Sequence, residues 1–76
     1  MNNFYTIEIQ SNADGTSGFL PYGFETQGDA EGKYLALRDA ARQSAVLIHT
    51  VMLIDNRGKV LESKSYVHPV QEPAEQ

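Results

Sequence analysis

The chain contains no cysteine, only two histidines and no long apolar run. Without cysteine there is no disulfide, and a structural metal is not expected, because His49 and His68 are isolated and zinc needs a cluster of Cys or His ligands. No segment has the roughly 20 apolar residues that a membrane helix requires. The N-terminus lacks the charged and apolar regions of a signal peptide, which favours a cytoplasmic location.

Basic residues are also scarce. Six Lys and Arg stand against ten Asp and Glu, for a net charge of −4, which disfavours general nucleic-acid binding. All six basic residues nevertheless lie between positions 33 and 64, an arrangement that allows a local basic surface on an acidic protein.

The 76 residues suffice for one domain with a thin core. Small folds usually need a disulfide, a metal or association with other chains. Because the first two are not expected here, association is the predicted source of additional stability.

Strand-like alternation opens the chain. Residues 4–10 alternate apolar and polar side chains, and Asp14-Gly15 predicts a turn. Residues 19–24 hold three aromatic residues, but Pro21 and Gly23 predict a short, irregular edge piece.

A helix is predicted over residues 27–43. Thr26 is its expected N-cap, with Asp29 three positions later. One apolar stripe, widened by Leu35, faces the core; its members are Ala30, Tyr34, Leu37 and Ala41.

Two further strands follow the helix. Residues 45–54 are apolar and rich in β-branched side chains, 55–58 form a turn with Gly58 in a left-handed conformation, and 59–68 return. Residues 69–76 are predicted to be a disordered tail. The sequence thus predicts one α+β domain over residues 1–68, in which one helix packs on an antiparallel sheet of three to four strands in the order β-(β)-α-β-β.

Both faces of the strand around residues 46–54 are apolar. Val46, Ile48, Thr50, Met52 and Ile54 line one face, and Leu47, His49, Val51 and Leu53 line the other. A single helix covers only one face of a sheet, so an apolar patch stays uncovered and predicts a homo-oligomer. The alternative is that residues 19–24 fold back across the patch.

No sequence motif indicates catalysis or a cofactor. The chain has no phosphate-binding glycine loop, no GxSxG and no HExxH, so an enzyme is not expected. Arg38 and Arg42 share one helix face and are able to clamp an anion, although a solvated face with local ion pairs explains them as well. His49 is typical of a satisfied interior residue, but at an oligomer interface two copies of it would line a shared pocket.

Residues at the end of the last strand give the best candidate site. Lys64, Tyr66 and His68 share one face by the strand period. A nucleotide base stacking on Tyr66, with its phosphate at Lys64 or His68, fits this row. The alternative is an exposed polar face on an edge strand.

The segment Tyr5-Thr6-Ile7-Glu8-Ile9-Gln10, the turn that follows it and the closing hairpin through Asp55-Asn56-Arg57-Gly58 resemble small proteins encoded by phages and prophages of gut bacteria. The resemblance spans nearly the whole chain except the tail and transfers no residue role. Such proteins often act against host defence, and some are oligomeric sponges that sequester a nucleotide immune signal. The resemblance therefore implies an anti-defence role in the host cytoplasm.

The leading hypothesis is a non-enzymatic, phage-type homo-oligomer that sequesters a small anionic nucleotide-derived signal, with no cofactor. One alternative is an inhibitor that binds a host defence protein through an acidic surface. Another is a small structural or accessory phage protein.

Overall fold

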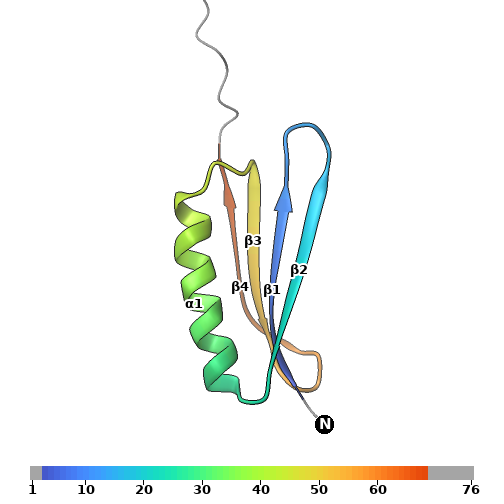
Figure 1. Ribbon diagram of the computed structural model, residues 1–76, viewed down its shortest axis with the longest axis vertical. Coiled ribbons are helices and arrows are strands. Elements are labelled where there is room, and N and C mark those ends of the chain that lie inside the picture. Colours follow the sequence, from blue (N-terminus) through green and yellow to red (C-terminus); the bar gives the residue numbers. More distant parts are fainter. Residues whose placement is uncertain (1–2, 69–76) are drawn as a thin grey trace, which may run out of the picture.

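The computed structural model describes residues 3–68 and has one helix packed on a four-stranded antiparallel sheet (Figure 1). The elements are β1 (Phe4–Ser11), β2 (Ser17–Phe24), α1 (Gln27–Gln43), β3 (Ile48–Ile54) and β4 (Val60–Val67). The strands lie side by side in the order β2-β1-β3-β4. This confirms the α+β prediction, with four strands. The predicted tail, residues 69–76, lies outside the described residues.

Glycine forms both hairpin turns as predicted. Gly15, between β1 and β2, has a φ of 92°, and Gly58, between β3 and β4, has a φ of 87°. These are left-handed conformations that side chains with a Cβ rarely adopt. In the second turn the Asp55 carboxylate accepts hydrogen bonds from the backbone N–H groups of Arg57 and Lys59.

The helix has the predicted bounds and the predicted cap. The Thr26 hydroxyl accepts a hydrogen bond from the backbone N–H of Asp29 at 3.1 Å. Ala30, Tyr34 and Ala41 are buried against the sheet, and Leu37 is partly buried. Leu35 does not widen this stripe as predicted, because its side chain is exposed.

Three strand predictions need correction. Residues 17–24 form a regular strand, not an irregular piece, because an edge position tolerates the missing N–H of Pro21. That strand extends the sheet and does not fold back across it. The third strand begins at Ile48, since residues 45–47 connect it to the helix, and the fourth covers Val60–Val67.

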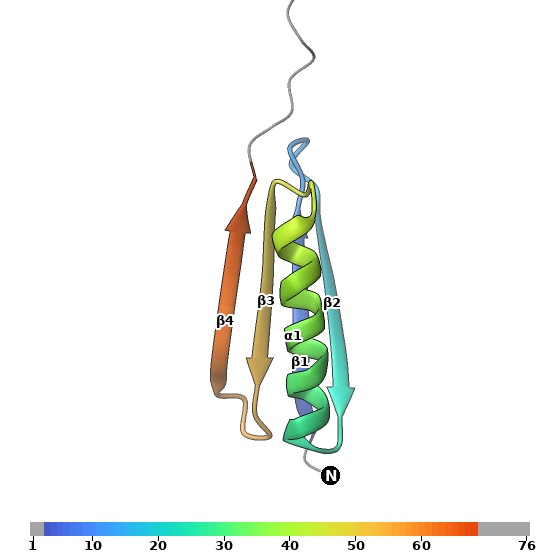
Figure 2. The ribbon, with the colours of Figure 1, turned by 90° about the vertical axis from the view of Figure 1, so that its left-hand side faces the viewer.

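The sheet has one face under α1 and one face, called here the open face, on which no other element of residues 3–68 packs (Figures 1 and 2). Val51 and Leu53 of β3 complete the core beneath the helix. α1 packs mainly against β3 and β1, and β4 extends beyond it (Figure 2). A bulge at Leu53/Ile54 pairs Val60 with Ile54, so Val60 lies on the face opposite to Glu62 and Lys64.

Candidate functional site

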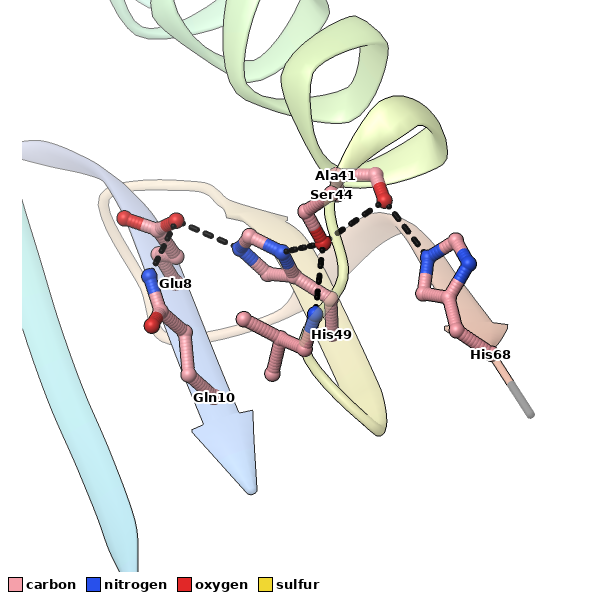
Figure 3. A network of polar contacts seen from close by, with 7 residues as sticks. Glu8, Gln10, Ala41, Ser44, His49 and His68 are labelled. Carbon is pink, nitrogen blue, oxygen red and sulfur yellow. Dashed lines mark hydrogen bonds and ion pairs between the residues drawn. The ribbon is translucent and has the colours of Figure 1, made fainter. Parts of the chain in front are cut away.

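A chain of buried polar groups runs beneath the C-terminal end of α1 (Figure 3). His49 Nε2 lies 2.5 Å from Glu8 Oε2, and both side chains are more than nine-tenths buried. Gln10 Nε2 donates to the same carboxylate oxygen at 3.0 Å. On the other side of the ring, His49 Nδ1 lies 2.9 Å from Ser44 Oγ. The contact between the Glu8 carboxylate and the His49 imidazole thus links the neighbouring strands β1 and β3.

This chain of contacts continues to β4 through the helix terminus. Ser44 is the C-cap of α1, and its hydroxyl oxygen lies within hydrogen-bond distance of the Ala41 carbonyl oxygen, at 3.2 Å. His68 Nε2 donates to that same carbonyl at 2.9 Å. Because the last carbonyls of a helix have no intrahelical donors and carry negative partial charge, they favour donors of this kind. The helix end is thereby fixed to both β3 and β4.

Sequence reasoning missed Glu8 and Ser44. Glu8 was taken only as a polar member of an alternating strand, yet it lies on the helix-covered face with Thr6. Ser44 follows directly on the last helical residue, a position where a hydroxyl satisfies a free carbonyl, and this was the available signal. The pairing of Glu8 with His49 depends on the register between β1 and β3, which the sequence does not specify.

Ser44, His49 and Glu8 are residue types that hydrolases combine, but their geometry here suits a structural role. Ser44 Oγ meets Nδ1 of the imidazole and the acid meets Nε2, the reverse of the usual arrangement. Ser44 Oγ also accepts from the Val46 N–H at 3.3 Å, and it lies at a helix C-terminus, where the dipole opposes a developing negative charge. Every buried side-chain N or O atom described in residues 3–68 has a hydrogen-bond partner.

The predicted row on β4 lies on the helix side of the sheet, beside α1. Lys64 Nζ lies 5.7 Å from the centre of the Tyr66 ring, and the Tyr66 and His68 rings stack with centroids 6.4 Å apart. The hydrogen bond from His68 to Ala41 orients its ring, and the second ring nitrogen points away from the helix (Figure 3). The row therefore offers a cation next to two stacked rings.

Both predicted arginines come from the same flank of α1. Arg38 lies over the Tyr34 ring, 5.7 Å from its centre. Burial raises the pKa of Tyr34, and Glu62 adds to the rise, whereas Arg38 opposes it. The hydrogen bond and the charge of Asp39 raise the pKa of Arg42. Tyr66 of β4 raises the same pKa by a smaller amount. His68 of the row contacts the Ala41 carbonyl, which directly precedes Arg42, so the helix flank and the row adjoin. They are called here the α1–β4 shoulder, which comprises Arg38, Arg42, Lys64, Tyr66 and His68.

His49 is separate from this surface and from the open face. It is buried under α1, so two copies of His49 do not line a pocket at the open face. The uncovered apolar patch and the Lys64 row lie apart, because the row lies on the helix side of the sheet and the patch on the other side. The interior interpretation of His49 is the one that its burial and hydrogen bonds support.

Within residues 3–68, no helix is long and apolar enough to cross a membrane, and no three His, Cys, Asp or Glu side chains gather as metal ligands. No family model, curated protein or solved structure matches the chain.

Proposed function

We propose that this chain is a non-catalytic binding protein that acts as a homo-oligomer and holds a small anionic ligand, a nucleotide-derived signal, at the α1–β4 shoulder. The observation that supports this is a row of Lys64 and two stacked rings, joined through His68 to the helix flank of Arg38 and Arg42, on a chain whose net charge is −4. The resemblance to phage and prophage proteins supports the biological role, which is sequestration of a host defence signal in the cytoplasm.

The chemistry of the shoulder suits a phosphate attached to an aromatic base. A base stacks on Tyr66 and His68, a contact that contributes about 1–3 kcal/mol per base in other nucleotide-binding proteins. Lys64 lies near the ring of Tyr66, and Lys64 and Arg42 supply donors to a phosphate. Arg42 is paired with Asp39 at 2.7 Å, but both side chains are more than half exposed. Exposed pairs contribute only about 0–1 kcal/mol, so a phosphate is able to replace Asp39.

Binding without turnover is the form of this proposal that the geometry favours. Hydrolysis of a phosphate ester needs a positioned base and an activated nucleophile beside the bound ligand. The hydroxyl-imidazole-carboxylate combination of Ser44, His49 and Glu8 is committed to hydrogen bonds under α1. Sequestration requires only affinity, which the stacked rings and cations provide.

Native mass spectrometry tests the proposal. The parent protein is mixed with cyclic and ADP-ribose-derived nucleotides, and we expect one of them to be retained at fixed stoichiometry with unchanged mass. A Lys64→Ala/Tyr66→Ala double variant should bind it at least about tenfold more weakly, because a stacking contact and a charged contact are both lost.

The chain provides a matched control on the other flank of α1. Lys33 Nζ lies 4.5 Å from the centre of the Tyr22 ring, a second Lys–Tyr pair. A Lys33→Ala/Tyr22→Ala variant makes the same chemical change away from the shoulder and should bind as the parent does. Equal losses in the two double variants would disprove the site, and a parent that retains no nucleotide would disprove the function.

A further inference from the structure

The open face of the sheet carries no charged side chain. Residues that pair across the strands share a face, so the register of the sheet defines its members. They are Tyr5, Ile7, Ile9, Ser11, Ser17, Phe19, Pro21, Gly23, Ile48, Thr50, Met52, Ile54, Val60, Ser63, Ser65 and Val67. A surface of four strands without Asp, Glu, Lys, Arg or His is unusual in a chain of which 21% is charged.

In β1, the polar and apolar side chains occupy the opposite faces from those expected in a sheet with one face in water. In an antiparallel sheet with one solvated face, apolar residues normally point to the core and polar residues to the solvent. Here Thr6 and Glu8 are buried under α1, at 0% and 6% exposure, whereas Ile7 and Ile9 point to the open face. β1 thus places Ile7 and Ile9 on the side that α1 does not cover, the arrangement expected where another surface covers that side.

Most of the large exposed apolar side chains lie on this face. Among residues 3–68, only Leu20 and Leu35 lie elsewhere; the others are Tyr5, Phe19, Ile48, Val60 and Val67. Four strands of about eight residues, spaced about 4.8 Å apart with a rise of about 3.3 Å, form a face of roughly 500 Å². Exposed apolar patches of that size mark interaction sites, and two such faces together reach the roughly 1,000 Å² that a specific interface requires.

We propose that two copies of this chain pack their open faces together, giving a symmetric two-sheet sandwich with a helix on each outer side. This inference specifies the assembly within the proposed function. A second copy is the occupant that the charges favour, because an uncharged face offers no attraction to a basic or acidic partner and no repulsion to itself. Two identically twisted sheets also pack well, at about −30°. The segment 69–76 is a poor cover, since Val70 and Ala74 are its only apolar residues apart from proline.

This arrangement leaves the two α1–β4 shoulders on opposite outer sides of the dimer. Each shoulder is formed within one chain, so the dimer takes two ligands and neither site needs the partner. Self-association and ligand binding are therefore separable by mutation.

Sedimentation equilibrium of the parent and two lysine variants tests the interface. Ile7 and Met52 are paired near the middle of the open face, so Ile7→Lys buries an unpaired charge in the sandwich. Leu35→Lys is the matched control, because Leu35 is an exposed apolar residue on α1. We expect the parent and Leu35→Lys to sediment at twice 8.4 kDa, and Ile7→Lys to weaken dimerisation at least a hundredfold while keeping the parent's circular dichroism spectrum.

A second variant tests whether the two open faces meet, without introducing a destabilising charge. Because the chain has no cysteine, Met52→Cys places one thiol near the centre of the face, and a short bismaleimide should cross-link two copies. Leu35→Cys should not cross-link. A monomeric parent at 100 µM of protein, a dimer unaffected by Ile7→Lys, or binding of the monomer to neutral phosphatidylcholine vesicles instead would each overturn the interface.

The nucleotide panel distinguishes this inference from the proposed function. Ile7→Lys monomers should still retain the nucleotide, and the Lys64→Ala/Tyr66→Ala variant should still dimerise. A dimer that binds no nucleotide disproves the function alone, and a monomer that binds one disproves the interface alone.

Discussion

Glu8 and His49 lie 41 positions apart in the chain and meet beneath α1, where both side chains are buried. Their contact joins the two central strands, and Ser44 connects it to the helix terminus. Such a pair is a demanding feature of a small core, because removing either partner leaves a polar group buried without its partner.

We expect Glu8→Leu to lower the free energy of unfolding by about 3–5 kcal/mol, since it leaves the buried His49 ring without its carboxylate. The Glu8→Leu/His49→Leu variant should recover most of that loss, because well-packed apolar residues often replace a buried pair at little cost. Urea unfolding at one fixed protein concentration measures both variants. Glu62→Leu removes an exposed carboxylate of β4 and is the control. A single variant as stable as the parent would mean that the pair contributes little.

Replacing Gly58 and Gly32 by alanine should change the stability of the protein in opposite directions. At Gly58, with a φ of 87°, alanine meets no atom within 4 Å, so only the backbone conformation opposes it and the expected loss is about 1–2 kcal/mol. At Gly32, inside α1 and equally open, alanine should stabilise the protein by up to about 1 kcal/mol. Thermal unfolding of the two variants gives the comparison. Equal effects would show that space, rather than backbone conformation, decides the outcome.

The β3–β4 turn should weaken in acid. Hydrogen bonds from the backbone N–H groups of Lys59 and Arg57 lower the pKa of Asp55 below its ordinary value of 3.8. A lowered folded-state pKa means that the stabilisation is complete above the unfolded-state value and is lost as the pH falls through the folded-state value. We expect the parent to lose part of its stability below about pH 4, and Asp55→Asn to lose less over the same range. Hydrogen bonds from Thr16 also lower the pKa of Asp14, so the parent loses some stability in acid for that reason too. The difference between the parent and Asp55→Asn isolates the contribution of Asp55.

Much of the fold was predictable because its signals are local. Thr26, the apolar stripe of α1 and the glycines at 15 and 58 each specify a cap, a face or a turn within a few residues. The direction in which β1 faces was not predictable in this way. Alternation separates Ile7 from Glu8, but only the packing of the helix on the sheet determines which of them is covered.

The candidate site was predictable only in part. The strand period grouped Lys64, Tyr66 and His68, and the helix period grouped Arg38 with Arg42, but their meeting on one shoulder depends on β4 lying next to β3. His49 was identified from the apolar strand around it, whereas its partners come from β1 and the helix cap. Those contacts depend on strand order and register, which are properties of the whole chain.

The protonated nitrogen of His49 is open to direct measurement. Nε2 faces a carboxylate, which only accepts, so this nitrogen should carry a proton in the folded protein. Nδ1 faces the Ser44 hydroxyl, which either donates to it or accepts from it while donating to the Ala41 carbonyl. Nitrogen-15 NMR of the imidazole should therefore show a proton on Nε2.

Ser44→Ala removes the partner of Nδ1 and the acceptor of the Val46 N–H together. We expect it to lower the free energy of unfolding by about 1–3 kcal/mol, the usual effect of leaving buried polar groups unpaired, while Nε2 stays protonated. Gln43→Ala changes an exposed polar side chain at the end of α1, away from the open face, and should have a smaller effect on stability. A proton found on Nδ1 alone in the parent would contradict the proposed direction of the Glu8–His49 hydrogen bond and would require a protonated Glu8 instead.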